Sequence, residues 1–162
     1  MNIKKQILEL LERDSTLTAE QIASMVNADL GAVEAIIKEC EDAGIIVGHR
    51  AVIDWDKTDF EAATALIEIK VTPQRGQGFE RIAQRICQYS EVESVYLMSG
   101  GFDITAIIKG KTLKEVALFV AEKLAPLDAV TATSTHFVLQ KFKEAGVFFK
   151  KDEEQQERMT AL

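Results

Sequence analysis

TAEQIASMVNADLGAVEAIIKECEDAG, residues 18–44, contains two helix signals separated by a short break. Thr18 and Gln21 have the spacing of a capping box, which predicts the start of a short helix. After a turn at Asn27-Ala28, Asp29 is placed to cap a second helix that Gly44 ends. The apolar positions at helical spacing are Ile22, Ala23 and Val26, followed by Val33, Ile36, Ile37 and Cys40. The stretch therefore predicts a helix-turn-helix.

The segments on either side extend this motif into a small domain. Residues 3–11 have apolar side chains at helical spacing and Asn2 as a possible cap. Beyond Gly44, two apolar runs, 45–47 and 51–53, flank Gly48-His49-Arg50, a pattern that predicts a small β-hairpin, or wing. Three helices and a wing make a winged helix-turn-helix over residues 1–53.

The remaining sequence predicts a second domain of a different kind. Residues 54–62 are polar and are interpreted as a linker, and residues 143–162 as a charged C-terminal tail, either helical on a partner or disordered. Between them, residues 63–142 predict strands and helices in the order βαββαβ. The expected fold class is therefore α+β, with an N-terminal winged helix-turn-helix and a C-terminal ferredoxin-like domain. The predicted elements are a strand at 65–71 ended by Pro73, a helix at 79–87, strands at 92–98 and 102–108, a helix at 112–124 and a strand at 130–139.

Composition and charge restrict the class of protein. The chain has 162 residues and a formal net charge of −7, which argues against sequence-independent binding to nucleic acid or acidic lipid. It contains no apolar run long enough for a membrane span and no signal-peptide pattern, so a cytoplasmic location is expected. The two cysteines, Cys40 and Cys87, are expected to be small core residues. The sequence predicts no metal site, no cofactor and no catalytic residue.

The predicted recognition helix is unusually acidic. Residues 29–43 contain five carboxylates and one base, Lys38, and residues 1–59 together have a formal charge of −6. A carboxylate can accept a hydrogen bond from cytosine, but nearby cations must still hold the phosphates. His49 and Arg50, at the expected tip of the wing, are the best candidates for phosphate contacts. The predicted DNA-binding residues are Leu30, Gly31, Glu34, Lys38, His49 and Arg50.

Three segments give the chain a family resemblance. They are GIIVGHRAVID (44–54), SVYLMSGGFDITAII (94–108) and AVTATSTHFVLQKFK (129–143). Together with the order of predicted elements, they make the chain resemble the Lrp/AsnC (feast/famine) family of transcriptional regulators over roughly residues 2–148. The second segment is the most specific, because members of that family have a Gly-x-aromatic-Asp turn there. The chain departs from the family at the recognition helix, which has Ala35 and Ile36 where basic residues are usual.

The resemblance implies a ligand-binding (RAM-type) second domain that forms homodimers or higher homo-oligomers. It also implies an effector, usually an amino acid, bound between subunits near the glycine turn and the last strand. The residues nominated in this way are Gly100, Gly101, Asp103, Thr133 and Thr135. Asp103 would take an ammonium group, and the threonine hydroxyls a carboxylate or side chain. An exposed strand face including Leu66, Tyr96, Ile104 and Phe137 is expected to support self-association.

Three functions from different classes remain open at this point. The first is a DNA-binding regulator in which an effector changes the oligomer and so the spacing of the DNA-binding domains. The second is a ligand-sensing or protein-docking module whose acidic helix-turn-helix no longer binds DNA. The third is an enzyme, because siroheme decarboxylases are similar in architecture, although two histidines in the whole chain are few for porphyrin chemistry. The first is the function that we predict.

Overall fold

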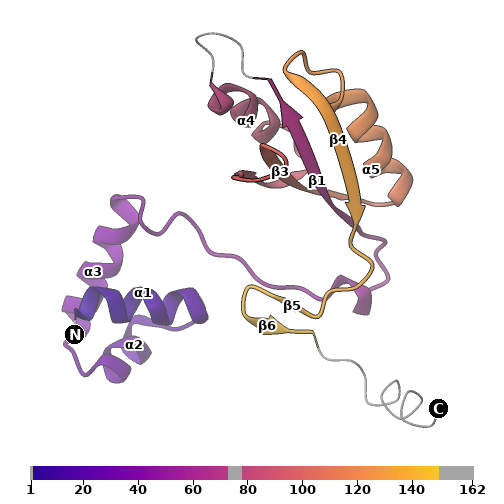
Figure 1. Ribbon diagram of the computed structural model, residues 1–162. Coiled ribbons are helices and arrows are strands. Elements are labelled where there is room, and N and C mark those ends of the chain that lie inside the picture. The colour runs from indigo at the N-terminus through magenta and orange to yellow at the C-terminus, as the bar shows by residue number, and fades with distance from the viewer. Residues whose placement is uncertain (1, 73–77, 150–162) are drawn as a thin grey trace. The chain divides into compact units, whose positions relative to one another are not determined.

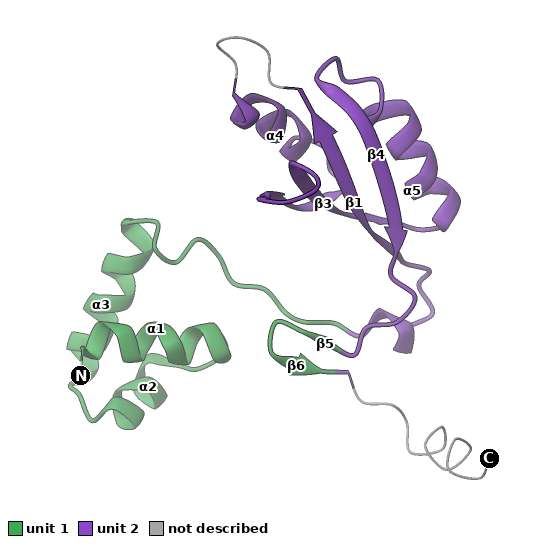
Figure 2. Cartoon of the chain, viewed as in Figure 1, with its two compact units in different colours: residues 1–53, 143–148 green, residues 54–142, 149–162 purple. Residues whose placement is uncertain are grey.

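The computed structural model describes residues 2–72 and 78–149. The chain divides by its contacts into two compact units, residues 1–53 with 143–148, and residues 54–142 with 149–162 (Figure 2). The predicted stop at Pro73 and most of the predicted tail lie outside the described residues.

The first unit contains the three predicted helices, α1 (Ile3–Arg13), α2 (Ala19–Val26) and α3 (Leu30–Asp42) (Figure 1). All three predicted caps are present: Asn2 accepts from Lys4 N, Asp29 accepts from Ala32 N, and Thr18 forms a complete capping box with Gln21. The helices enclose a core in which Ile7, Ile22 and Val33 are at most 1% exposed. The helix-turn-helix prediction is confirmed.

The predicted hairpin at residues 45–53 is wrong. The amides of Ile45 and Ile46 both donate to Cys40 O, which extends the end of α3, and residues 47–54 have no regular secondary structure. Gly48-His49-Arg50 contains no residue with positive φ, which the tight two-residue hairpin turns need. A hairpin forms instead between β5 (Lys143–Glu144) and β6 (Val147–Phe148), where Ala145 and Gly146 have φ of 46° and 81°. Residues 143–148, predicted to be part of a helical or disordered tail, are therefore a short β-hairpin.

The second unit is the predicted ferredoxin-like sandwich. Its elements are β1 (Ala63–Val71), α4 (Phe79–Cys87), β2 (Val92–Leu97), β3 (Ile104–Gly110), α5 (Leu113–Phe119) continued by a π-helical turn (Val120–Leu124), and β4 (Val130–Phe137). The strands form one antiparallel sheet in the order β2-β3-β1-β4. As predicted, Thr112 caps α5 by accepting from Glu115 N.

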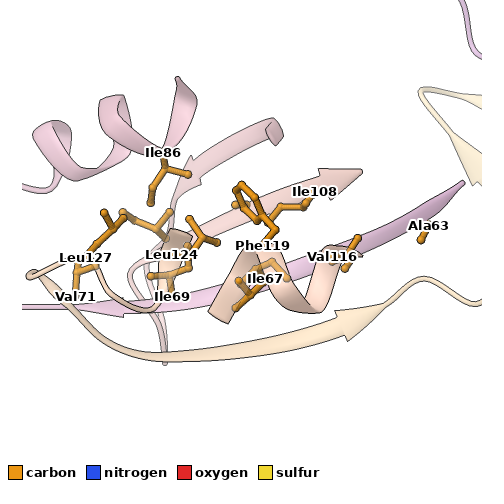
Figure 3. Close-up of a cluster of buried hydrophobic side chains, with 14 residues drawn as sticks. Ala63, Ile67, Ile69, Val71, Ile86, Ile108, Val116, Phe119, Leu124 and Leu127 are labelled. Carbon is orange, nitrogen blue, oxygen red and sulfur yellow. The ribbon is translucent and has the colours of Figure 1, made fainter. Parts of the chain in front are cut away.

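The core of this unit lies between the sheet and the helices α4 and α5 (Figure 3). Every second residue of β1, from Ala63 to Val71, points into it, and Ile104, Ala106 and Ile108 of β3 do the same. The prediction that Cys87 is a core residue is wrong: it is exposed at the last position of α4, where Ile86 fills the core. Cys40, in contrast, is buried as predicted.

Alternate residues of the strands point away from α4 and α5, and we call this surface the open face of the sheet. By strand register it carries Leu66, Glu68, Lys70, Tyr96, Thr105, Ile107, Ala132, Ser134 and His136. Leu66 and Tyr96 were predicted to lie on an exposed face and do so. Ile104 and Phe137 were assigned to it wrongly, because they pair with the core residues Ile69 and Ala65 and so share their side of the sheet.

One polar atom of the open face is buried without a partner. Thr105 is 5% exposed, and its Oγ1 makes no hydrogen bond to any described residue. Replacing Thr105 with valine keeps the side chain's shape and removes the unsatisfied hydroxyl, so it should raise the free energy of unfolding by about 1 kcal/mol. Urea denaturation of the two proteins measures this difference. A less stable valine variant would show that the hydroxyl has a partner.

Candidate DNA-binding and effector sites

The recognition helix α3 exposes one side along its whole length. Leu30 is 36% exposed, and Gly31, Glu34 and Lys38 are also exposed, whereas Val33 and Cys40 are fully buried. Positions 30, 34 and 38 follow one another at the i, i+4 spacing that places side chains on one side of a helix. The four residues predicted to contact DNA from α3 therefore share one accessible surface.

Gly31 also has a structural reason to be glycine. A Cβ atom at this position would lie 3.2 Å from Asp29 Oδ2, the oxygen that caps α3. Because that contact is tighter than usual, the absence of a side chain at Gly31 leaves room for the cap. The first turn of α3 is set by this pair together with Asn27, which has φ of 51° and ends α2.

Several of the carboxylates that make α3 acidic already have partners. Asp29 accepts the amide of Ala32, and Glu39 Oε1 lies 2.8 Å from Lys4 Nζ on α1. The hydrogen bond to Glu39 raises the pKa of Lys4. Glu41 Oε1 lies 3.9 Å from His49 Nε2. Fewer carboxylates of α3 therefore face solvent without a nearby donor than its formal charge suggests.

The two predicted phosphate contacts, His49 and Arg50, are exposed but do not lie at the tip of a hairpin. They belong to the segment 47–54, which has no regular structure, and a guanidinium nitrogen of Arg50 lies 4.0 Å from Glu144 Oε1 of β5. Both residues therefore have a carboxylate neighbour, which a phosphate would have to displace or share.

The turn between β2 and β3 is tied to the end of β1 through Asp103. Its Oδ2 accepts from Val71 N at 2.9 Å, and its own amide donates to Ile69 O at 3.1 Å. The Asp103 carboxylate, which the resemblance assigned to an ammonium group, thus already has a structural role beside the irregularity in register at Lys70/Val71. Replacing it with alanine would leave the Val71 amide without its acceptor.

Gly100 and Gly101, in the same turn, are sterically unconstrained within the chain. Neither has positive φ, and a Cβ added to either meets no atom within 4 Å. The ordinary explanation for such glycines, a hairpin turn that needs positive φ, does not apply here. Because both residues lack a side chain, the backbone at Gly100 and Gly101 is accessible.

A cavity of about 290 Å³ lies between this turn and the strands β1 and β4, and we call it the sheet pocket. It brings together two of the five nominated effector residues, Gly101 and Thr133. Gly100, Asp103 and Thr135 do not line it, and Thr135 pairs with the core residue Ile67. The lining residues are Glu68, Lys70, Gly101, Phe102, Ala132, Thr133 and Ser134.

Three polar residues of the sheet pocket were missed from the sequence. Glu68, Lys70 and Ser134 were not nominated as site residues. The available signal was the spacing of Glu68 and Lys70, two opposite charges at i, i+2 on a strand whose other side is entirely apolar. The pairing of β1 with β4, which brings Ser134 opposite Glu68, depends on the tertiary fold.

Family models match both parts of the chain. Residues 64–148 match the Lrp/AsnC ligand-binding domain, and residues 2–47 match a winged helix-turn-helix DNA-binding domain. The chain belongs to the Lrp/AsnC family. Because that family consists of transcriptional regulators, the prediction that the chain is not an enzyme is confirmed.

Two transcriptional regulators match this Lrp/AsnC chain over almost its full length. The uncharacterized HTH-type transcriptional regulator YugG of Bacillus subtilis is 45% identical over 146 residues, which cover 90% of this chain and 88% of YugG. The proline dehydrogenase transcriptional activator of Rhizobium radiobacter is 28% identical, with 88% and 93% of the two chains covered.

Solved structures agree on the fold. A transcriptional regulator from Neisseria meningitidis, crystallised as a complex with L-Met, superimposes with a TM-score of 0.72 over 89% of this chain and 92% of its own, at 21% identity. In the chain described here, no helix within residues 2–72 and 78–149 is long and apolar enough to cross a membrane.

Proposed function

We propose that this Lrp/AsnC regulator binds specific DNA sites through α3 and that an amino acid bound in the sheet pocket controls this binding. The observation that carries the proposal is the combination of two surfaces in one chain. One is the exposed side of α3, with Leu30, Gly31, Glu34 and Lys38 in a row. The other is a cavity of about 290 Å³ beside Gly101, within a ligand-binding domain.

The DNA-binding part is supported by the way in which the acidic helix is neutralised. Lys4 compensates Glu39, and His49 lies near Glu41, so fewer free carboxylates oppose the phosphates than the sequence indicates. Lys38 is exposed, and it makes no ion pair within residues 2–72 and 78–149. Glu34 would contact a base edge and Lys38 a phosphate or base, with Arg50 adding a second phosphate contact.

The effector part is supported by the size and position of the sheet pocket. Its volume is close to the lower end of the range of small-molecule sites, which suits a ligand as small as an amino acid. The backbone at Gly101 is open to such a ligand, and Ser134 on the open face supplies a hydroxyl group. The complex of the Neisseria regulator with L-Met concerns a protein of the same fold and supports this class of effector.

Self-association is the third part of the proposal. The open face carries Tyr96, which is 54% exposed, beside the half-buried Leu66 and Ile107. A second copy that covered this face would bury these side chains and the sheet pocket together. An effector at that place would then alter the oligomer, and with it the spacing of two α3 helices on DNA.

The test is to capture sheared genomic DNA from the source organism on the full-length protein at low salt, with and without a mixture of L-amino acids. The retained DNA is eluted with increasing salt and sequenced. We expect a few sites to persist to moderate salt and to change in occupancy with the amino acids. The Arg50→Ala variant should elute earlier from the same sites, because each lost phosphate contact lowers the slope of log K against log salt by about 1.

Two results would contradict the proposal. If nothing is retained above background at about 50 mM salt, where phosphate contacts are strong, the helix-turn-helix does not bind DNA by itself. If sites are retained but no amino acid alters them, the effector class is wrong while the DNA-binding part stands.

A further inference from the structure

The sheet pocket carries one positive and one negative side chain from the same strand. Glu68 and Lys70 are two residues apart on β1, point to the same side of the sheet and both line the cavity. Their Cα atoms are separated by about 6.7 Å along an extended strand. Their opposite charges therefore face one small volume.

The two charges differ in what they already contact. Lys70 is exposed, and its ammonium makes no ion pair with any described residue. Glu68 Oε2 lies 3.4 Å from His136 Nε2, and that ring nitrogen lies 3.3 Å from Ser134 Oγ. Glu68 is thus held on the open face by a neighbour on β4, with its side chain still 32% exposed. Lys70 offers a free cation beside it.

The rest of the sheet pocket adds no competing charge. Phe102 and Ala132 are apolar, Gly101 exposes backbone, and Ser134 offers a hydroxyl group, whereas the side chain of Thr133 lies on the same side of the sheet as its core partner Ile69. The carboxylate nearest in sequence to this turn, Asp103, does not line the cavity, and it accepts the amide of Val71. The pocket is therefore matched to a small ligand with one negative and one positive group close together.

We propose that Lys70 binds the α-carboxylate of the amino-acid effector and that Glu68 binds its α-ammonium. This inference rests on the proposed function and specifies it: the pocket selects zwitterions, and it places the charge recognition on β1 rather than on Asp103. The side chain of the ligand would then point toward Phe102 and Ala132, where contacts are apolar. Each charged group of the ligand gains a charge-assisted hydrogen bond, and a ligand that lacks one of them leaves Lys70 or Glu68 unpaired.

The test uses three related sets of probes on the full-length protein, with binding measured by calorimetry. The first is the twenty proteinogenic L-amino acids. Any that bind are then compared with their α-amides, which lack the carboxylate, and with their N-acetyl derivatives, which lack the ammonium. We expect the unmodified protein to prefer the free amino acid to either derivative by about tenfold or more.

The variants separate the two charges. Lys70→Gln should weaken the free amino acid and bring it within about twofold of the amide, while preference over the N-acetyl derivative persists. Glu68→Gln should bring the affinity of the free amino acid within about twofold of that of the N-acetyl derivative, while the preference over the amide persists. Lys114→Gln removes an exposed lysine of α5 that, like Lys70, makes no ion pair with a described residue and lies outside the sheet pocket. It is the matched control and should leave all three affinities unchanged.

The outcomes distinguish this inference from the proposed function. If an amino acid binds and both variants keep the unmodified protein's preferences, the effector class is right and the assignment to Glu68 and Lys70 is overturned. If no amino acid binds the unmodified protein, the effector part of the proposed function fails, and this inference fails with it. If the preferences change as described, both stand.

Discussion

Replacing Lys38 with alanine is expected to weaken binding to a specific DNA site by a factor of about 30 to 20,000. Lys38 is the basic residue on the exposed side of α3. It lies four residues after Glu34 and makes no ion pair with a described residue. A side chain that contacts a base edge contributes about 1–3 kcal/mol. Because the proposed homodimer presents α3 twice, the variant loses two such contacts, or about 2–6 kcal/mol in total.

Fluorescence anisotropy at fixed salt, on a site recovered by genomic capture, measures the loss. Lys114→Ala, which removes the same charge from an exposed position of α5, is the matched control and should bind as the unmodified protein does. A loss that is equal on all sequences would place Lys38 on a phosphate, whereas a loss confined to the specific site would place it on a base. An unchanged affinity would show that Lys38 does not contact DNA.

Replacing Ile67 with alanine is expected to lower the free energy of unfolding of the second unit by about 3 kcal/mol. Ile67 is fully buried in the middle of the cluster between the sheet and α5 (Figure 3), and Ala106 and Thr135 are its partners on the neighbouring strands. Alanine leaves a cavity there that rigid strands on both sides cannot close. For a unit of this size, the melting temperature should fall by roughly 12–24 °C in calorimetry.

Ile107→Ala is the matched control for this variant. Ile107 is only half-buried and lies on the open face, so the same chemical change should cost less. If a second copy covers the open face, the melting temperature of the Ile107→Ala protein should depend on protein concentration, because dimer formation then contributes to its stability. An Ile67→Ala protein as stable as the unmodified one would contradict the assignment of the core.

The helices and their caps could be predicted because their signals are local. The Thr18–Gln21 box, the Asp29 cap and the Thr112 cap each depend on residues within one turn of the chain, and each is present. The hairpin at 45–53 could not be judged in the same way. β-branched residues favour extended chain, but only the turn and a partner strand make a hairpin. The true hairpin turns at Ala145-Gly146, and neither an alanine at positive φ nor its charged surroundings indicated a turn.

The sequence predicted in part where the candidate effector pocket lies, but not the charged residues that line it. The glycine turn and the last strand do meet in a pocket, through Gly101 and Thr133. The use of Asp103 by the amide of Val71 depends on the way in which the β2–β3 turn lies across the end of β1, and Glu68 and Lys70 enter because β4 pairs with β1. Both facts come from strand pairing between distant residues, which the alternation of a single strand does not determine.

The hairpin Lys143–Phe148 belongs by its contacts to the first unit, although residues on both sides of it belong to the second. Within the first unit, a guanidinium nitrogen of Arg50 lies 4.0 Å from Glu144 Oε1 of this hairpin. The polypeptide therefore passes from one unit to the other after residue 53 and again after β4, at residue 142. One covalent route joins the strands around the sheet pocket to the DNA-binding helices, through residues 54–62 and the segment before them. From β4 the chain enters the hairpin, which belongs to the first unit by non-covalent contacts such as that of Glu144 with Arg50. A fragment that ends at residue 53 keeps the three helices but loses the hairpin and this contact.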